Sequence, residues 1–410
     1  MNIQFPEKLY TQYFYGITLR KLCSLLYSPI PPAELVIDAR QTTFIEPSVL
    51  CDLLNYLYLL QSIKNIDVFI KFGGNKILIS FLDRCKFLSL SDFARIFKTD
   101  IVTISSEPDR YDNQSIGKAQ NTEHIRRILL PKNYSEETHE YEYGEKSDTA
   151  TIRKMLTNEM IGKTLSRINA DLISLVKRKK IAMQVQYSAN LANIVRELPS
   201  PYCEMISNSI RHGCDSTGDD IYCFYTFHFY KDSGLCFGNS DGGEGFYKSL
   251  RRKFDSRKFM PSVFTFDEYT NPSNSPMIQS LMGILEGLAY RLNKKLEYGL
   301  PYILTAIGLE FSGKIIIHSD YTALVFTEET IQDLFEIEEN KLCGTISENG
   351  EISYNHYSIS AFRRENMRSL VLNLAKQTEY VKKSRLFFYD YCFPGTHISA
   401  NLHEKHSGGL

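Results

Sequence analysis

The chain has 410 residues, with 47 Lys and Arg against 48 Asp and Glu, so its formal net charge at pH 7 is −1. This length is enough for two or three domains of the usual size. A hydrophobic fraction of 43% with a charged fraction of 23% is typical of a globular protein. The near-zero charge excludes a global field that would draw the chain to nucleic acid or to an anionic membrane.

The nine cysteines indicate a reducing compartment. Their number is odd and no two form a C-x-x-C pair, so we interpret them as small buried hydrophobes rather than as disulfides or zinc ligands. The first ten residues, MNIQFPEKLY, lack the features of a secretory signal. The densest apolar stretch, residues 50–60, is shorter than the ~20 residues that a bilayer requires. We therefore expect a cytoplasmic protein without a membrane span.

The first hundred residues alternate between strand and helix patterns. A short apolar run over 34–38 predicts a buried strand, and leucines at three- and four-residue spacing over 50–60 predict an amphipathic helix. A second strand is expected over 67–72 and a second helix over 77–88. This order predicts parallel strands joined by helical crossovers.

Residues 103–150 are polar, charged and poor in aliphatic side chains. We interpret them as a linker between an N-terminal domain over 1–102 and a C-terminal domain over 151–410. A short helix is expected in the linker from His124 to Leu130.

The C-terminal domain is expected to combine helices with strands, and no element is assigned over 331–390. The expected elements are a helical region over 151–213, a strand over 221–230, a short strand ending at Phe237, helices over 278–293 and 300–311, and a strand over 314–318.

A row of polar side chains occurs in the segment EMISNSIRHG. Glu204, Asn208 and His212 are four residues apart, so they would share one face of a helix. Such a row presents a carboxylate, an amide and an imidazole to a common ligand.

About thirty residues later a strand ends in Asp241, which Gly243 and Gly245 follow. An aspartate on a glycine-rich loop can bind the edge of a purine, because glycines let the backbone approach a ligand closely. The alternative interpretation of both segments is a capped surface helix followed by an ordinary glycine turn.

In this order and spacing the two segments resemble the N box (E-x-x-x-N) and the first glycine box (D-x-G-x-G) of the Bergerat-fold, or GHKL, ATPases. That superfamily contains gyrase, histidine kinases, mismatch-repair ATPases and anti-sigma-factor kinases. The resemblance implies that Asn208 helps to hold Mg²⁺ and that Glu204 is catalytic, acting on the attacking water or on a hydroxyl nucleophile. It also implies that Asp241 accepts a hydrogen bond from the adenine amino group, and His212 is included as a nucleotide-binding residue.

Further segments extend the resemblance over most of residues 155–402. Gly299 and Leu300 begin a segment similar to the second glycine box, where helix N-terminal amides meet the phosphates. Only one glycine stands there, where family members carry two or three. Lys294, with Lys295 beside it, could reach phosphate oxygens; a solvated pair is the alternative.

A Gly-Thr pair begins the last strand of the Bergerat fold. Gly395-Thr396 resembles it, and the resemblance implies that Thr396 faces the nucleotide. Gly344-Thr345 is the rival for this role.

The N-terminal region resembles a STAS domain, the fold of anti-sigma-factor antagonists. The matching segments are residues 35–38, 44–47, 50–60 and 68–70. In regulated members a serine after the second strand is phosphorylated, and Ser48 lies near that position. Ser48 is also placed to cap the following helix.

Together these features predict an α/β protein with a STAS-like N-terminal domain. The C-terminal domain is expected to be a two-layer α/β sandwich with the Bergerat ATP-binding fold, in which helices cover one face of a mixed sheet. No Ser-His-Asp or Cys-His arrangement can be identified from the sequence.

The first functional hypothesis is an ATP-driven conformational switch with slow hydrolysis that acts on a protein partner. The alternatives are a serine/threonine protein kinase of the anti-sigma-factor type, and an interaction module that binds nucleotide without turnover. The basic cluster over 251–253 lacks a nucleic-acid motif, so a solvated face is expected there. Homodimerisation stays open.

Overall fold

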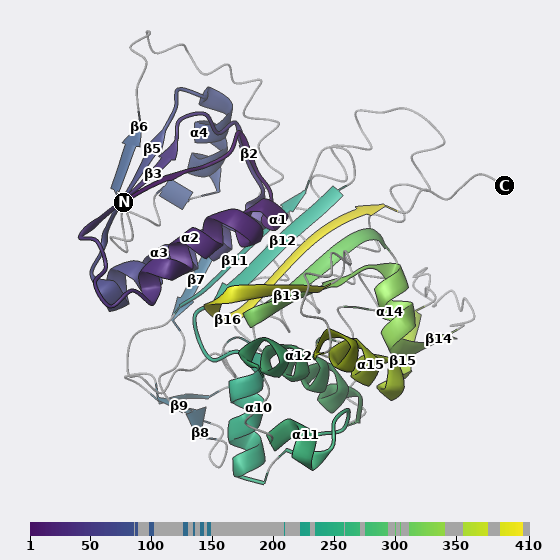
Figure 1. Cartoon of the computed structure of the whole chain (residues 1–410). Helices are drawn as coiled ribbons and strands as arrows, with labels where there is room; N and C mark the ends of the chain where they lie inside the picture. The colour runs from purple at the N-terminus through teal and green to yellow at the C-terminus, as the bar shows by residue number, and fades with distance from the viewer. Residues whose placement is uncertain are drawn as a thin grey trace, which may run out of the picture.

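The fold is described from a computed structural model of the chain. The structure describes residues 1–85, 87–88, 98–101, 126–129, 134–135, 140–142, 146–148, 209, 222–229, 234–257, 259–270, 275–293, 300, 304, 311–340, 356–375 and 386–404. Helices and strands alternate through these residues, which confirms the general α/β class. They are arranged as stacked layers of sheet and helix (Figure 1).

A parallel sheet forms the outer layer of the N-terminal part, residues 1–101, in the order β1-β3-β5-β6. Its strands are β1 (Asn2–Gln4), β3 (Glu34–Ala39), β5 (Asp67–Phe72) and β6 (Lys98–Ile101). The parallel pairing of β3 with β5 confirms the strand–helix–strand prediction, because parallel neighbours require a crossover. Strands β2 (Lys8–Leu9) and β4 (Phe44–Ile45) form a separate, two-stranded parallel sheet.

Helices join these strands: α1 (Thr11–Tyr13), the π-helix η1 (Phe14–Thr18), α2 (Leu19–Leu26), α3 (Pro47–Lys64) and α4 (Lys76–Arg84). The prediction over 50–60 located α3 but missed both ends. Pro47 starts the helix, where its missing N–H costs nothing, and Asn65 ends it in the left-handed conformation at φ 52°. Every residue of α3 from Pro47 to Leu60 is buried, as expected for a helix between two layers.

An antiparallel sheet forms the centre of the molecule, in the order β13-β16-β12-β11-β7. Its strands are β7 (Arg126–Leu129), β11 (Tyr222–Phe229), β12 (Gly234–Asp241), β13 (Phe311–Phe326) and β16 (Leu386–Glu404). All of its described pairings are antiparallel, so the prediction of a mixed sheet is wrong for this part of the chain.

Strand β7 also corrects the interpretation of residues 103–150. Instead of a linker helix near His124, Arg126–Leu129 pairs with β11 as the edge of the central sheet. The sequence did not predict this strand because it contains two arginines, and an edge strand with charged residues resembles a loop in sequence. The small strands β8 (Tyr134–Ser135), β9 (Glu140–Glu142) and β10 (Lys146–Asp148) form a separate antiparallel sheet.

One face of the central sheet packs against helices from its own part of the chain. These are α10 (Phe246–Asp255), α11 (Phe266–Thr270), α12 (Pro276–Asn293), α14 (Glu328–Leu334) and α15 (Arg364–Ala375), with the hairpin β14 (Phe335–Asn340) and β15 (His356–Phe362). The expected helix over 278–293 corresponds to α12.

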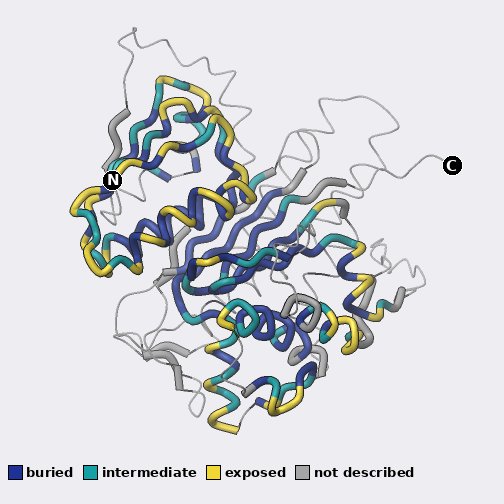
Figure 2. The backbone as a smooth tube through the Cα atoms, in the orientation of Figure 1, coloured by how far each residue is buried: buried dark blue, intermediate teal, exposed yellow. Residues whose placement is uncertain are grey.

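The other face is covered by α2 and α3 of the N-terminal part (Figure 1). Along β13, Ile315 and Ile317 pack into the core with α12, whereas Ile316 packs into the core with α3. Figure 2 accordingly shows the central strands buried along most of their length. The sheet is thus covered on both faces, and not on one as the sequence predicted.

Two general expectations concern burial. The six described cysteines are buried free thiols, as expected. Within the described ranges, no helix combines the length and apolarity that a bilayer crossing demands.

Candidate functional site

Asp241 stands at the end of β12 and contacts Ser209 and Thr396, which lie 32 and 155 residues away in sequence. Its carboxylate is 1% exposed. Oδ2 accepts a hydrogen bond from Ser209 Oγ at 2.7 Å, and Oδ1 accepts from the backbone amides of Gly243 and Thr396, both at 3.2 Å. Ser209, the loop after β12 and the Gly395–Thr396 part of β16 therefore meet at one carboxylate.

Glycines make this meeting possible. Gly395 has φ +99°, and a Cβ at this position would lie 1.9 Å from the carbonyl oxygen of Asp241. A Cβ on Gly245 would lie 2.1 Å from Asp320 Oδ2. Only residues without a side chain permit such approaches. The backbone turns on both sides of Asp241 are thus tightly packed.

A polar chain behind Asp241 orients its partners. Cys223 Sγ contacts Asn239 Oδ1 at 3.1 Å, and Asn239 Nδ2 donates to Ser209 Oγ at 2.9 Å. Because Asn239 donates to the Ser209 hydroxyl, the single hydrogen of that hydroxyl is free to go to Asp241. The chain therefore fixes the carboxylate of Asp241 as a hydrogen-bond acceptor.

Burial raises the pKa of Asp241 to about 7. The hydrogen bonds from Ser209, Thr396 and Gly243 favour the ionised form and limit this rise, while the nearby carboxylate of Asp320 adds to it. A buried carboxyl group that changes its charge near neutral pH is a typical mark of a functional site.

Ser209 and Asn239 were not selected from the sequence. Ser209 follows Asn208 directly, is helical and is buried. Asn239 lies two residues before Asp241, so it points to the same face of β12. This two-residue spacing was the only sequence signal for Asn239, and nothing local could show that Ser209 would lie beside it.

The structure brings together some of the predicted site residues. Asp241, Gly243 and Thr396 meet, as described, and Gly245 begins α10 beside them. Leu300 is helical, and its side chain packs in the core with α12. The predicted residues outside the described ranges are Glu204, Asn208, His212, Lys294, Gly299 and the rival pair Gly344-Thr345.

Ser48 differs from both of its interpretations. Glu46 is the residue before α3 and no side chain caps that helix, so the capping prediction is wrong. The Ser48 hydroxyl lies 3.1 Å from Thr11 Oγ1, and the residue is 1% exposed. A Cβ on Gly238 would lie 2.7 Å from Ser48 Cα, so α3 is pressed against β12 here. In this packing no kinase can reach the hydroxyl.

A Ser-His-Asp group does occur, between α3 and the central sheet. Ser240 Oγ lies 2.7 Å from His397 Nδ1, and Asp52 Oδ1 lies 3.7 Å from the same nitrogen. In a catalytic triad the serine and the aspartate use opposite ring nitrogens. All three residues are at most 2% exposed. The group is therefore structural and not hydrolytic.

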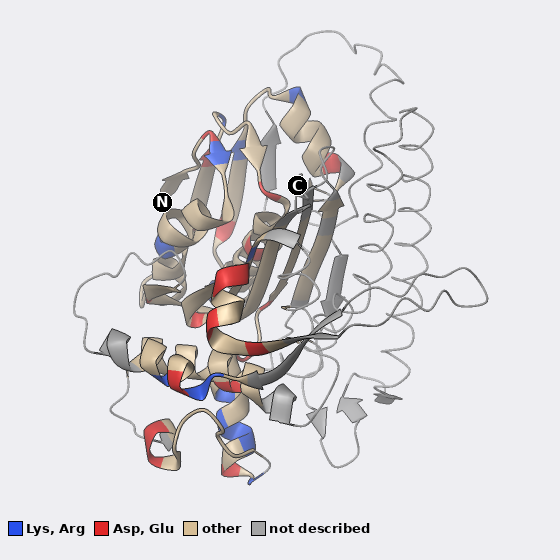
Figure 3. Cartoon of the chain, turned by 90° about the vertical axis from the view of Figure 1, so that its right-hand side faces the viewer, with Lys and Arg blue, Asp and Glu red and all other residues tan. Residues whose placement is uncertain are grey.

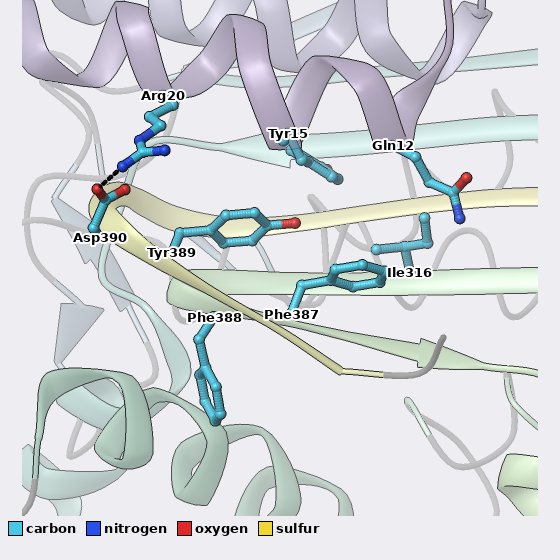
Figure 4. A pocket seen from close by; sticks show the side chains of 9 residues that line it. Gln12, Tyr15, Arg20, Ile316, Phe387, Phe388, Tyr389 and Asp390 are labelled. Atoms are coloured by element: carbon cyan, nitrogen blue, oxygen red, sulfur yellow. Dashed lines mark hydrogen bonds and ion pairs between the residues drawn. The ribbon is translucent and has the colours of Figure 1, made fainter. Parts of the chain in front are cut away.

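A small hollow lies between the N-terminal helices and the β13–β16 pair (Figure 4). Tyr15, Ile316 and Tyr389 are among its lining residues, and the ion pair of Arg20 with Asp390 stands at its end. Its volume is about 140 Å³. Ligand pockets usually have about 300–1,000 Å³, so this hollow is too small for a nucleotide.

The basic cluster of α10 is paired with acidic groups. Arg251 bonds to Asp255 at 3.2 Å, and Arg252 bonds to Glu244 at 3.2 Å. Figure 3 shows Lys and Arg interspersed with Asp and Glu along the helices at the bottom of that view. This pairing agrees with the expected solvated face.

Comparisons with protein-family models, with curated proteins and with solved structures gave no match. Among the residues that the structure describes, no group of three or more His, Cys, Asp or Glu side chains is placed to hold a metal ion.

Proposed function

We propose that the chain binds Mg-ATP at Asp241 and acts as an ATP-driven conformational switch, with slow hydrolysis that changes its contact with a protein partner. The observation that carries this proposal is the buried Asp241 carboxylate, held between Ser209, Gly243 and Thr396. These residues come from, or directly beside, three segments that resemble the N box, the first glycine box and the Gly-Thr strand of Bergerat-fold ATPases.

The hydrogen-bond count at Asp241 supports a purine amino group as its partner. An ionised carboxylate offers about four acceptor positions. Ser209, Gly243 and Thr396 donate three hydrogen bonds, and four less three leaves one position. The amino group of adenine is a donor that fits a single remaining acceptor.

The architecture in this proposal is a Bergerat ATP-binding fold for the central sheet and its helices, with a STAS-like N-terminal part. A central sheet whose own helices pack on one face supports the first assignment, although its described pairings are antiparallel rather than mixed. A parallel sheet with the order β1-β3-β5-β6 supports the second.

The remaining roles follow from the resemblance. Asn208 would hold Mg²⁺ through its amide, and Glu204 would act on the attacking water. Ser209, one residue beyond Asn208, lies at Asp241 and supports this placement. Lys294 and the amides that follow Gly299 would bind the phosphates, with His212 nearby.

The binding test is a titration of Mg-ATP against the parent and Asp241→Asn. Hydrogen bonds to charged groups contribute about 1.5–3 kcal/mol, so the variant should bind about 10- to 100-fold more weakly. Glu286→Gln is the matched control, because Glu286 is also a buried carboxylate that accepts backbone amides, on α12. A parent that does not bind, or an Asp241→Asn variant that binds equally well, overturns the proposal.

Turnover distinguishes the switch from the two alternatives. With γ-labelled ATP and candidate partners, free phosphate supports the switch, label on a protein supports a serine/threonine kinase, and neither supports a binding module. Glu204→Ala should abolish turnover while it keeps binding, and Asn208→Ala should weaken Mg-dependent binding.

A further inference from the structure

A buried hydrogen-bond chain leads from α3 to a bulge of β16, here called the turn at Pro394, that contacts Asp241. Asn55 Nδ2 donates to Ser240 Oγ at 3.1 Å, Ser240 Oγ lies 2.7 Å from His397 Nδ1, and His397 Nε2 lies 2.9 Å from the Pro394 carbonyl oxygen. The side chains of Asn55, Ser240 and His397 are 0% exposed. The chain thus joins α3, β12 and β16 without access to water.

The links from Asn55 to Pro394 are satisfied when the Ser240 hydroxyl donates to His397. The Pro394 carbonyl can only accept, so His397 Nε2 carries the hydrogen and donates to it. Burial keeps His397 neutral by lowering its pKa well below the ordinary value, so Nδ1 is bare and accepts from the Ser240 hydroxyl. Ser240 in turn accepts from Asn55. This arrangement runs from α3 to the Pro394 carbonyl, and the Asp52 carboxyl of α3 is a second acceptor beside the Ser240 hydroxyl.

The chain lies on the opposite face of the two strands that carry the proposed nucleotide site. Side chains alternate between faces along a strand, so Ser240 faces α3 while Asp241 faces away from it. His397 likewise faces α3, and Thr396 faces the site. Gly395 lies between Pro394 and Thr396 and packs directly on the Asp241 backbone. The last link of the chain thus ends one residue before that contact.

We propose that Asn55, Ser240 and His397 are positioning residues of the nucleotide site. Through Pro394 they hold the turn so that the Thr396 amide stays on Asp241 Oδ1 and leaves one acceptor position for the purine. This inference rests on the proposed function. It makes the N-terminal part a component of the site, so nucleotide affinity and the docking of α3 are thermodynamically coupled.

The matched pair Ser240→Ala and Ser399→Ala tests this inference. Ser399 lies on β16, two residues from His397 and on the same face, and is 4% exposed. Its hydroxyl has no hydrogen-bond partner among the described residues. Both substitutions remove a buried hydroxyl beneath α3, but only Ser240→Ala breaks the chain.

The first readout is the preference for ATP over ITP, which has an oxygen in place of the amino group. Coupling between sites is typically 5- to 150-fold, so Ser240→Ala should reduce this preference at least about fivefold. Ser399→Ala should leave it within about twofold. General destabilisation would weaken the binding of both nucleotides alike and leave the ratio unchanged.

The second readout is amide hydrogen exchange over residues 395–397 without nucleotide. Ser240→Ala should speed exchange at least about fivefold, and Ser399→Ala should not. Asn55→Ala should act in the same direction, with Glu46→Gln as its control. Glu46 also contacts β16 from the N-terminal part, but at Asn401, away from the site.

The outcomes separate the two proposals. If the parent binds no ATP, the proposed function fails, and the exchange rates still decide whether the chain positions the turn. If the parent binds ATP but Ser240→Ala matches Ser399→Ala in both readouts, the positioning role is overturned.

Discussion

At the scale of single residues, buried titratable groups line both faces of the central strands. Burial raises the pKa values of Asp241 and Asp52 to about 7 each, and lowers the pKa of His318 to about 3. Asp241 has donors that stabilise its charge, whereas both ring nitrogens of His318 are buried without a hydrogen-bond partner in the described structure. Burial therefore opposes the ionisation of the two aspartates as the pH rises, and it opposes the protonation of His318 as the pH falls.

Nucleotide affinity should depend on the charge of Asp241. The adenine amino group needs the ionised carboxylate, and with a pKa of about 7 its ionised fraction rises about tenfold between pH 6 and pH 8. Mg-ATP should therefore bind about tenfold more tightly at pH 8 than at pH 6, measured by calorimetric titration. The phosphates of ATP also titrate in this range, and Asp241→Asn is the control for their effect. The pH dependence that comes from Asp241 should be absent in this variant. If Asp241→Asn showed the same pH dependence of affinity as the parent, the assignment would be contradicted.

Replacing His318 should stabilise the protein, above all in acid. The pKa of His318 is about 3 when folded and 6.5 when unfolded. Protonation of His318 in the unfolded chain therefore lowers the free energy of unfolding as the pH falls through 6.5. At pH 5 this loss is about 2 kcal/mol, and at pH 8 it is near zero. His318→Phe should remove it, since Tyr15 and Phe393 already surround the ring. Urea denaturation at both pH values measures the difference, and an equal effect at both would refute this account.

A carboxylate on α12 anchors the loop before α11. Glu286 is fully buried, and its oxygens accept from the backbone amides of Ser262, Val263 and Phe264 at 2.9–3.1 Å. Glu286→Ala leaves these donors unpaired, and should lower the free energy of unfolding by about 3 kcal/mol or more. Glu286→Gln retains one acceptor oxygen and should cost less. Equal losses in the two variants, measured by denaturant titration, would show that side-chain volume rather than hydrogen bonding is responsible.

At the scale of elements, α3 determines how the two sheets pack. It is buried along Pro47–Leu60 because the N-terminal sheet and the central sheet cover opposite sides of it. Its closest approach is at Gly238 of β12, where the absence of a side chain admits the backbone of Ser48. A side chain at Gly238 would therefore require α3 and β12 to move apart.

Gly238→Ala should separate α3 from β12. The added Cβ would lie 2.7 Å from Ser48 Cα, and overpacking of this kind costs about 1–3 kcal/mol. Gly16→Ala is the control, because a Cβ there meets nothing within 4 Å and alanine favours a helix by about 0.5–1 kcal/mol. Thermal unfolding should show a lower Tm for the first variant only; a Gly238→Ala protein as stable as the parent would disprove the tight approach.

At the scale of the whole molecule, the N-terminal part serves as the second cover of the central sheet. Apolar side chains of the sheet pack into the same core as α2 and α3; they are Phe224, Ile316, Ala323, Val325, Tyr389, Tyr391 and Phe393. Strands that are buried on both faces cannot lose one cover without exposing a contiguous apolar surface.

Removing residues 1–102 should therefore expose the central sheet. The fragment 103–410 should bind a hydrophobic dye more strongly than the full chain, and it should associate or unfold at a lower temperature. Dye fluorescence and light scattering measure both effects, with the full chain as the reference. A monomeric fragment with the parent Tm would mean that the N-terminal part is not needed as a cover.

The sequence by itself determined the local elements whose periodicity is regular. The alternation of β3, α3 and β5, the β11–β12 hairpin, α12 and the Asp241 glycine loop all follow from spacing of apolar residues and from glycine chemistry. It placed the start of the last strand at Gly395-Thr396 only through the resemblance, and it did not reveal the earlier part of β16 from Leu386 or α10, whose surface is rich in charge.

Only the tertiary structure decided which residues meet. It placed Ser209 and Thr396 on Asp241, put α3 rather than solvent against the second face of the sheet, and turned the expected cap Ser48 into a packed core residue. The physical reason is that hydrogen-bond partners and strand faces depend on packing between segments from about 30 to more than 150 residues apart. Local periodicity carries no information about such contacts.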